Sequence, residues 1–454
     1  MTGEILSTTS TLSYDREKML VATLLKRSHI KLVMASLCDK IKMKHGTGLT
    51  AYFIRYRRMN TPLATITEAT DPANSSFSLD EVSVTLDEWG DIITVSSRAI
   101  LTTSHPLIQQ ALALLADNAA RVMDREIQLV LLAGTNIQYG DGSVLTRRTV
   151  TSAMTINETV ITKARVSMVT AGAPPKGGPS GDAKPMAANG TFTNGQSYVA
   201  VCGPNVIGDI TRPGASLGTF AAVATYQGNG NKLYNYEIGT WLGMRWVETN
   251  FIPSFTLLGN STAAVADGGS GGITGMTMTE SNHASGALTA QEYNWKVTRK
   301  DLLRGFEEAI SIEHTFTVTG ANDCLTFVMP STAGYAYNIY FGTATGDANL
   351  KLAVENAAPS SSNEILDESS STTTAPDNIL ETDASLAAIH PVYIFADDSI
   401  SWVGFFDTQV MITPDQSIIG NVLKLKRAIG YKFYGKAVIK DQTRILRLEV
   451  ASTF

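Results

Sequence analysis

The sequence has few of the residues on which enzymes and metal proteins depend. Its three cysteines, Cys38, Cys202 and Cys324, are far apart and odd in number, so they imply no disulfide framework. Its six histidines stand singly, and none has a second histidine or cysteine at the spacing of a metal site. An enzyme of this length should contain at least one convergent set of reactive side chains. We therefore predict that the protein is not an enzyme and that it has no catalytic, cofactor-binding or metal site.

Charge is scarce as well. Charged residues make up 17% of the chain, and the formal net charge is −6. A dedicated nucleic-acid binder is usually basic, so this balance argues against that class. Two explanations of the low charge stay open: large buried contacts between subunits, and a strand-rich fold with many Ser, Thr and Gly.

Long uninterrupted hydrophobic runs are missing. The most apolar stretch, from Leu107 to Leu132, is interrupted by charged residues that a membrane span would not tolerate. The first residues, MTGEILSTTSTLS, lack the basic and apolar regions of a signal peptide. We expect no membrane partner, and assembly in a cytosol.

The chain of 454 residues is long enough for two or three domains. Residues 1–48 are predicted to form a polar arm and then a helix, because Ser13 can cap it and apolar residues recur at helical spacing as far as Ile41. Residues 1–60 hold 11 Lys and Arg against 4 Asp and Glu. This excess favours contact with a neighbour's acidic face or with nucleic acid, and ordinary solvated lysines are the alternative.

Residues 49–100 are typical of an extended β-hairpin. The runs LTAYFIRYRR and EVSVTLDEWGDIITVSSRAI alternate apolar and polar side chains, and a long polar tip separates them. The tip is longer than a hairpin needs, and long ordered loops usually have a function. We predict that the hairpin lies over an adjacent subunit. Its candidate interface residues are Arg55, Arg57, Arg58, Glu68 and Asp71.

Residues 101–150 contain the strongest helix signal. Ser104 can cap the stretch HPLIQQALALLADNAARVMDREIQLVLLAG, Pro106 lies in its first turn, and Gly134 ends it. These signals predict a helix over 105–133. At 1.5 Å per residue such a helix would be about 43 Å long, which suits a spine better than a surface helix of a small domain.

Residues 151–253 mix helix and strand. A helix is expected from Asn157, QSYVAVCGPNVIGDI reads as a buried strand and a short helix, and NYEIGTWLGMRWVETNFIP reads as strand, turn and strand. This order suggests an α+β domain around a sheet. The last segment also supplies three aromatic interface candidates, Tyr236, Trp241 and Trp246. They could anchor the domain's own core or a contact between subunits, and both roles stay open.

Residues 254–389 interrupt this domain. Short strands such as EYNWKVTRK and YAYNIYFG recur at the spacing of a β-sandwich. A Gly- and Ser-rich linker precedes them, and the polar stretch SSSNEILDESSSTTTAPDN reads as an exposed loop. The insert holds 16 Asp and Glu against 5 Lys and Arg. We expect it to project from the outside of an assembly, and the alternative that it fills a contact between subunits stays open.

Residues 390–454 return to strands. PVYIFADDSISWVGF is strand-like, and RILRLEV alternates, which sets Arg447 and Glu449 opposite Leu446 and Leu448.

The order of these elements resembles the HK97-type major capsid proteins of tailed phages, and most of all their short-tailed, podovirus-like branch. The resembling stretches are TITEATDPANSSFSLDEVSVTLDEWGDIITVSS, LADNAARVMDREIQLVLLAGTN, YVAVCGPNVIGDI with YEIGTWLGMRWVETN, and AIGYKFYGKAVIKDQTRILRLEV. In that family they would be the extended E-loop, the spine helix, the axial domain and the closing strands of the peripheral domain. The resemblance covers residues 1–253 and 390–454, and the insert departs from it.

The resemblance implies an α+β, HK97-like capsid fold: N-terminal arm, E-loop hairpin, spine helix, peripheral and axial domains, with an inserted all-β, immunoglobulin-like domain. It implies a major capsid protein that forms the hexamers and pentamers of an icosahedral head around double-stranded DNA. The implied partners are other copies, a portal, scaffold or decoration proteins, and packaged DNA on the inner face. The implied location is the virion capsid, after assembly in the cytoplasm of a host bacterium. A phage surface or tail adhesin that binds the host through the inserted β-sandwich is the alternative.

Overall fold

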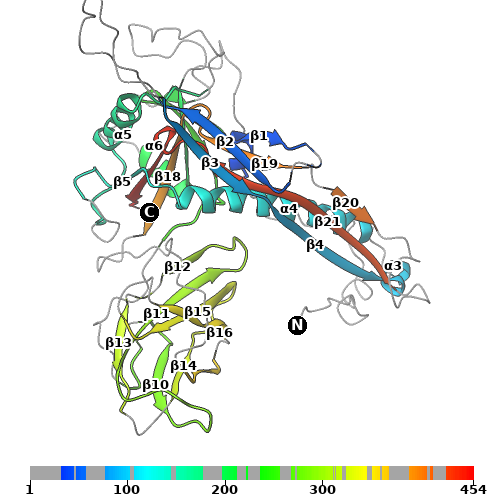
Figure 1. The fold of residues 1–454 in the computed structure, drawn as a ribbon, viewed down its shortest axis with the longest axis vertical. Helices are drawn as coiled ribbons and strands as arrows, with labels where there is room; N and C mark the ends of the chain where they lie inside the picture. Colours follow the sequence, from blue (N-terminus) through cyan, green and yellow to red (C-terminus); the bar gives the residue numbers. More distant parts are fainter. Residues whose placement is uncertain are drawn as a thin grey trace, which may run out of the picture. The chain divides into compact units, whose positions relative to one another are not determined.

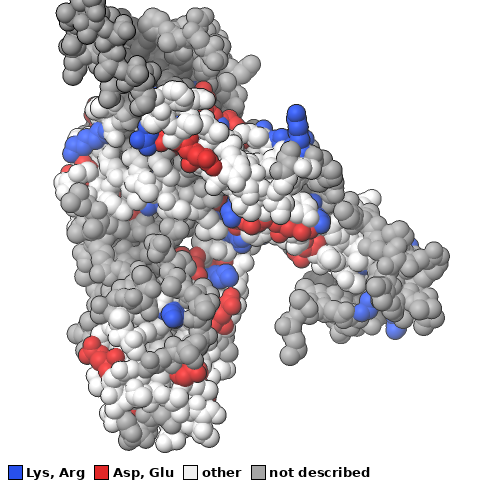
Figure 2. Space-filling view, in the orientation of Figure 1, with Lys and Arg blue, Asp and Glu red and all other residues white. Residues whose placement is uncertain are grey.

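The computed structural model describes residues 32–44, 46, 48–57, 77–102, 107–144, 150–176, 197–211, 221–222, 236–255, 267–270, 273–309, 311, 313–319, 324–344, 350–357, 360–367, 388–405, 409–412 and 426–453. They form a mixed fold, mostly of strands (Figure 1). On the face drawn in Figure 2, uncharged side chains predominate among these residues. The chain divides into two compact units. The first holds Leu37–Ile127 and Ile400–Lys440, and the second holds Gln128–Ser399 and Asp441–Phe454.

The first unit is built on one long strand, β21 (Lys426–Ile439). Along one edge β21 pairs antiparallel with β4 (Asp87–Ser96). Along its other edge it pairs antiparallel with β19 (Ile400–Gly404) and β20 (Gln409–Ile412). The sheet therefore joins a segment near the start of the chain to one near its end.

The N-terminal arm contributes a strand to this sheet. β1 (Asp39–Lys42) pairs parallel with β19. The expected extension of the helix to Ile41 is therefore wrong, since α2 (Met34–Leu37) ends at Leu37, and the part of the expected arm and helix before residue 32 lies outside the described residues. The side chains of DKIK alternate between partly buried and exposed, as an edge strand allows, so tertiary pairing overrides the helical spacing.

The predicted hairpin is confirmed. β2 (Thr50–Tyr56) and β3 (Leu79–Thr85) pair antiparallel over their whole lengths. The second predicted run is not one strand, however, because it breaks at Leu86, which joins a buried apolar cluster of the first unit. β4 then begins, and the end of the run is the helix α3 (Ser97–Thr102).

Two strands of the first unit approach closely at Gly435. Atoms of the Trp402 ring on β19 lie 2.4 to 2.8 Å from the position of a Cβ at residue 435. We expect Gly435→Ala to displace the indole ring and to lower the free energy of unfolding by about 1–3 kcal/mol, as overpacking does. Denaturant unfolding of the soluble chain measures this. Trp402→Phe in the Gly435→Ala background removes clashing atoms and should recover part of the loss. Equal stability of Gly435→Ala and the parent chain would contradict the prediction.

The long helix expected over 105–133 is confirmed as α4 (Leu107–Leu132). Within the first unit it packs against β4. The Arg125 guanidinium lies 5.5 Å from the centre of the Trp89 ring, and the Asn118 side chain donates a hydrogen bond of 2.8 Å to Asp91. A cation–π contact and a hydrogen bond therefore fix which face of α4 meets the sheet.

The second unit is organised around a seven-stranded sheet. Helices α5 (Glu158–Thr170) and α6 (Pro204–Thr211) share one buried apolar cluster with it. Asn157 caps α5 by accepting a hydrogen bond of 3.0 Å from the Val160 backbone. The predicted helix, buried strand and short helix are thus confirmed. In spatial order the strands are β5 (Ile137–Tyr139), β22 (Ile445–Ala451), β18 (Ile389–Phe395), β6 (Tyr198–Cys202), β9 (Met244–Glu248), β8 (Glu237–Trp241) and β7 (Ala221–Ala222).

The insert is a β-sandwich in its described residues, as its strand spacing predicted. One sheet has the order β10–β14–β17, and the other has the order β12–β11–β15–β16 with β13 also paired to β11. Side chains from both sheets, among them Trp295 and Phe327, form one buried cluster. The strands are β10 (Thr277–Ser281), β11 (Glu292–Asp301), β12 (Glu307–Ala309), β13 (His314–Thr317), β14 (Cys324–Val328), β15 (Tyr335–Gly342), β16 (Lys351–Ala357) and β17 (Ser362–Ile365).

The polar stretch expected to be an exposed loop begins as a strand. β17 forms an edge of the three-stranded sheet by pairing with β14. Asn363 and Ile365 point inward, and Asn363 donates a hydrogen bond of 3.0 Å to the Phe327 carbonyl. The burial of Asn363 and Ile365 therefore places this serine-rich segment in the sheet. Residues 368–387 lie outside the described part of the chain.

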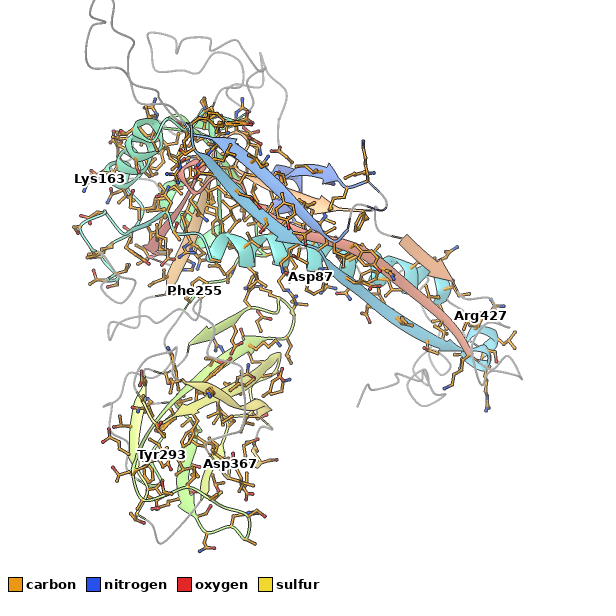
Figure 3. The ribbon with its side chains drawn as sticks, viewed as in Figure 1. Asp87, Lys163, Phe255, Tyr293, Asp367 and Arg427 are labelled. Atoms are coloured by element: carbon orange, nitrogen blue, oxygen red, sulfur yellow. The ribbon has the colours of Figure 1, made fainter. Side chains whose placement is uncertain are left out.

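The two ends of the insert meet at one place in the second unit. Phe255 and Ile389 exchange two backbone hydrogen bonds of 3.0 and 2.9 Å. Figure 3 shows Phe255 where the chain leaves the sheet for the insert. The Phe251 ring lies 6.2 Å from the Phe306 ring of the insert. The insert therefore leaves and rejoins the second unit through adjacent backbone positions.

Candidate assembly surface

The β2–β3 hairpin has a packed side and an open side. On the packed side, Ala51, Phe53 and Val82 contact a buried cluster of the first unit that includes Val84 and Val403. Since successive strand residues point to opposite sides, the residues between them face away from this cluster.

Large apolar side chains fill the open side. Tyr52, Ile54 and Tyr56 are 63%, 61% and 68% exposed. Leu79 is paired with Tyr56 in register and is 51% exposed, and the Phe77 ring lies 5.8 Å from the Tyr56 ring. Monomeric soluble proteins rarely expose large contiguous apolar patches, which makes this patch a candidate contact surface. We call Tyr52, Ile54, Tyr56, Phe77 and Leu79 the hairpin face.

Charged side chains accompany the hairpin face. Arg55 and Arg57 lie 3.2 and 2.6 Å from the Asp80 carboxylate, and the hydrogen bond from Arg57 lowers the pKa of Asp80 below its usual value. These pairs are open to solvent and contribute little stability. Glu81, opposite Ile54 in register, is exposed and makes no hydrogen bond or ion pair with the residues that the structure describes.

Of the hairpin candidates proposed from the sequence, the structure brings Arg55 and Arg57 together, and Arg58, Glu68 and Asp71 lie outside the described residues. The hairpin face is not among the candidates proposed from the sequence. The signal was present in TAYFIRY, where large apolar residues occupy both sides of the strand, whereas a hairpin packed on one side only needs them on one.

The aromatic candidates of the second unit need a correction. Trp241 and Trp246 are 3% and 0% exposed, belong to the buried cluster of the seven-stranded sheet, and have ring centres 6.1 Å apart. Leu242 and Gly243 connect their strands with φ angles of 49° and 79°, as in a type I′ turn. Of the two roles left open, both indoles have the core role, and a buried ring cannot contact a neighbour. Tyr236 is partly exposed and stays a candidate.

Reactive chemistry is not concentrated anywhere in the described residues. They contain no group of three or more His, Cys, Asp or Glu placed to hold a metal ion. Cys38, Cys202 and Cys324 are all buried. Burial raises the pKa of the Cys202 thiol well above its usual range, so it is not a thiolate nucleophile. No helix in the same residues has the length and hydropathy needed to cross a membrane.

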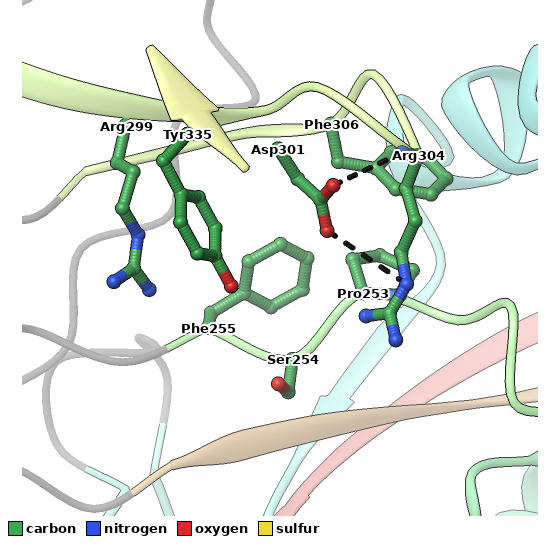
Figure 4. A pocket seen from close by; sticks show the side chains of 8 residues that line it. All are labelled: Pro253, Ser254, Phe255, Arg299, Asp301, Arg304, Phe306 and Tyr335. Carbon is green, nitrogen blue, oxygen red and sulfur yellow. Dashed lines mark hydrogen bonds and ion pairs between the residues drawn. The ribbon is translucent and has the colours of Figure 1, made fainter. Parts of the chain in front are cut away.

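A small pocket lies beside the junction of the insert (Figure 4). Two arginines and several aromatic rings line it. The Arg299 guanidinium lies 4.4 Å from the centre of the Tyr335 ring, and Arg304 Nε lies 3.8 Å from the Asp301 carboxylate. Both arginines are thus engaged within the chain.

A buried ion pair lies on β22, within the alternating run RILRLEV. Arg447 and Glu449 are 4% and 0% exposed, and Arg447 Nε lies 2.9 Å from Glu449 Oε1. Arg447 also donates hydrogen bonds to the Leu131 and Leu132 carbonyls at the end of α4, and the Leu131 carbonyl accepts from the Gly134 amide as well. The alternation of the run does not show that both of its sides are buried, which they are because β22 lies between β5 and β18 and is covered on both faces.

His390 on β18 gives the second unit a pH dependence. Its burial lowers its pKa below the ordinary 6.5, and Asp209 opposes this. The unfolded chain binds the proton more tightly, so this contribution to stability is full above about pH 6.5 and is lost as the pH falls towards the lower folded value. We expect the free energy of unfolding to drop between about pH 8 and pH 5, and to drop less in His390→Gln. Denaturant unfolding at both pH values checks this, and an unchanged drop in His390→Gln would assign the effect to another group.

No family model and no curated protein matches the sequence. Solved structures do. The chain is similar to one in the capsid of Ralstonia phage GP4, with 8% sequence identity, coverage of 96% of each chain and a TM-score of 0.51. It is also similar to a chain of the cyanophage Pam1 capsid asymmetric unit, with 10% identity, coverage of 100% of this chain and 99% of that one, and a TM-score of 0.50. The chain has the HK97-like fold of phage capsid proteins.

The predicted α+β capsid fold is thereby confirmed. The assignment of the β2–β3 hairpin as the E-loop and of α4 as the spine helix stays a prediction from the resemblance. Because the sequence identity is only 8% and 10%, the similarity shows the fold alone. Membership of the podovirus-like branch and the immunoglobulin-like type of the sandwich stay predictions.

Proposed function

We propose that this chain is a major capsid protein that self-assembles into hexamers and pentamers, which form the icosahedral head around a phage's double-stranded DNA genome. The observation that carries the proposal is the hairpin face, five large apolar side chains left open to solvent on a capsid fold. An isolated soluble subunit gains nothing from exposing them, whereas a repeated contact would bury them. The role is structural and not enzymatic.

The proposal extends to partners and location. Besides its own copies, the chain would contact a portal, scaffold or decoration proteins, and DNA without sequence specificity on the inner wall. The basic excess in residues 1–60 supports contact with acidic neighbours or with DNA. The chain would be made and assembled in the cytoplasm of a host bacterium and would end in the virion capsid.

Expression followed by negative-stain microscopy and sedimentation tests the function. We expect rings, capsomers or closed shells from the chain alone or after co-expression with the other head proteins of its phage. Purified virions should contain the chain in far more copies than any tail protein, which separates a capsid protein from an adhesin. A chain that stays monomeric under both conditions and is rare in virions would overturn the proposal.

A further inference from the structure

The insert exposes large apolar side chains at one place. Leu302 and Leu303, in the turn between β11 and β12, are 60% and 59% exposed. No other large apolar side chain in the described part of the insert is exposed. Two adjacent exposed leucines at the tip of a turn form a small protruding apolar surface. We call residues 300–306 the insert turn.

Backbone hydrogen bonds hold the insert turn in one shape. The Asp301 carboxylate accepts from the Leu303 and Arg304 amides at 2.8 and 3.1 Å, and the Asp301 carbonyl accepts from Gly305 at 2.6 Å. Gly305 has a φ of 75°, which glycine adopts without strain. The next residue, Phe306, is buried. Because the turn is already ordered, docking the leucines costs little conformational entropy.

The charges beside the two apolar patches of this chain are complementary. Lys300 immediately precedes the tip on β11, is partly exposed, and its ammonium makes no hydrogen bond or ion pair with the described residues. Glu81 lies within the hairpin face and also has no partner among those residues. Each patch therefore combines exposed apolar side chains with one unpaired charge, and the two charges are opposite in sign. Such complementarity selects a partner surface and sets its orientation.

We propose that the insert turn docks on the hairpin face of a second copy of this chain. Leu302 and Leu303 pack against Tyr52 and Tyr56 of that copy, and Lys300 lies near its Glu81. This rests on the proposed function, because it requires copies held side by side. It also decides what the insert does: besides any outward projection, it contributes a contact that ties neighbouring subunits together.

Replacing the two leucines with serine tests whether their side chains make the contact. In Leu302→Ser/Leu303→Ser the sandwich core is untouched, so the melting temperature of the soluble subunit should not change. The yield of particles should fall at least about tenfold, as expected when central apolar contacts of an interface are lost. Leu302→Met/Leu303→Met keeps the apolar area and should assemble normally. Equal yields from the serine and parent chains would overturn the inference.

Charge exchange tests the receiving surface. Lys300→Glu and Glu81→Lys should each lower the particle yield by like-charge contact, and the double variant should recover most of it. If the double variant is no better than the single ones, the insert turn does not meet the hairpin face, and the inference is wrong.

Cross-linking tests whether the contact joins two copies. Leu303→Cys/Ile54→Cys places one thiol in each patch, and the three native cysteines are buried. Oxidised particles should give ladders of covalent oligomers on a denaturing gel, and Leu303→Cys alone should not. A cross-link within single chains would contradict a contact between copies.

If the parent chain fails to assemble, the proposed function fails. If it assembles and the serine variant loses only adsorption to host cells, the insert turn serves a host surface and this inference alone fails.

Discussion

Tyr52→Ser/Ile54→Ser/Tyr56→Ser is expected to give a folded, soluble subunit that forms no closed particles. The three side chains are 61% to 68% exposed, so replacing them removes little from the subunit's own core. If they are buried at a contact, each contributes roughly 1.5–3 kcal/mol. Losing all three at every copy of a repeated contact would therefore prevent closure.

Particle yield and subunit stability need to be measured together. Sedimentation and negative-stain microscopy give the yield, and thermal unfolding of the soluble subunit gives its stability. Phe53→Ser is the matched control, because Phe53 packs on the other side of the same strand. It should destabilise the subunit itself. Normal particles from the triple variant would show that the hairpin face is not an assembly surface.

Arg447→Met is expected to lower the free energy of unfolding of the second unit by about 3–5 kcal/mol, the usual cost of removing one partner of a buried ion pair. Glu449 is fully buried and would keep a charge without its partner. The Leu132 carbonyl at the end of α4 would lose the Arg447 donor at the same time, whereas the Leu131 carbonyl would keep the Gly134 amide. Both losses act in the folded state only, because water satisfies these groups in the unfolded chain.

The double variant Arg447→Met/Glu449→Leu should be less destabilised than Arg447→Met, since it leaves no uncompensated charge. Asp398→Asn serves as the surface control, because asparagine tolerates the φ of 51° at this position. It removes the exposed charge 3.4 Å from Arg444 and should change stability by less than about 1 kcal/mol. Denaturant unfolding of all three variants, monitored by tryptophan fluorescence, makes the comparison. Additive effects of the two substitutions at Arg447 and Glu449 would mean that the two side chains do not stabilise each other.

The sequence predicted those elements whose signals are local. The helix α4 has apolar periodicity over its whole length, α5 has its capping Asn157, and the β2–β3 hairpin has two alternating runs. In each case the residues that decide the structure lie within one helix or one strand pair. Order and spacing of these elements then carried the resemblance to a capsid fold.

The elements that were missed depend on what covers them. The alternating pattern of β22 is that of a half-exposed strand. However, β22 lies between two strands, and its side chains are buried on both faces of the sheet. β1 and β17 are short and polar and exist because a sheet edge accepts them. Periodicity reports how side chains alternate and not how many layers surround them.

The candidate interface was only partly predictable for the same reason. A sequence shows charge directly, so charged residues such as Arg57 can be recognised as interface candidates. It does not show which side chains are exposed. Sequence patterns therefore neither reveal the apolar hairpin face nor exclude the buried Trp241 and Trp246. An exposed apolar patch can be recognised only when the packed side of the strand is known.

The adjacent backbone positions of Phe255 and Ile389 make the junction of the insert a permissive attachment point. The two backbone hydrogen bonds between Phe255 and Ile389 can form whatever the length of the chain between these residues. The entropic cost of closing a loop rises by only about 0.6 kcal/mol for each doubling of its length. A short turn, or a foreign domain with neighbouring termini, could therefore take the same place without shifting the register of β18. Engineering and evolution alike could exchange the module there and keep the seven-stranded sheet of the second unit intact.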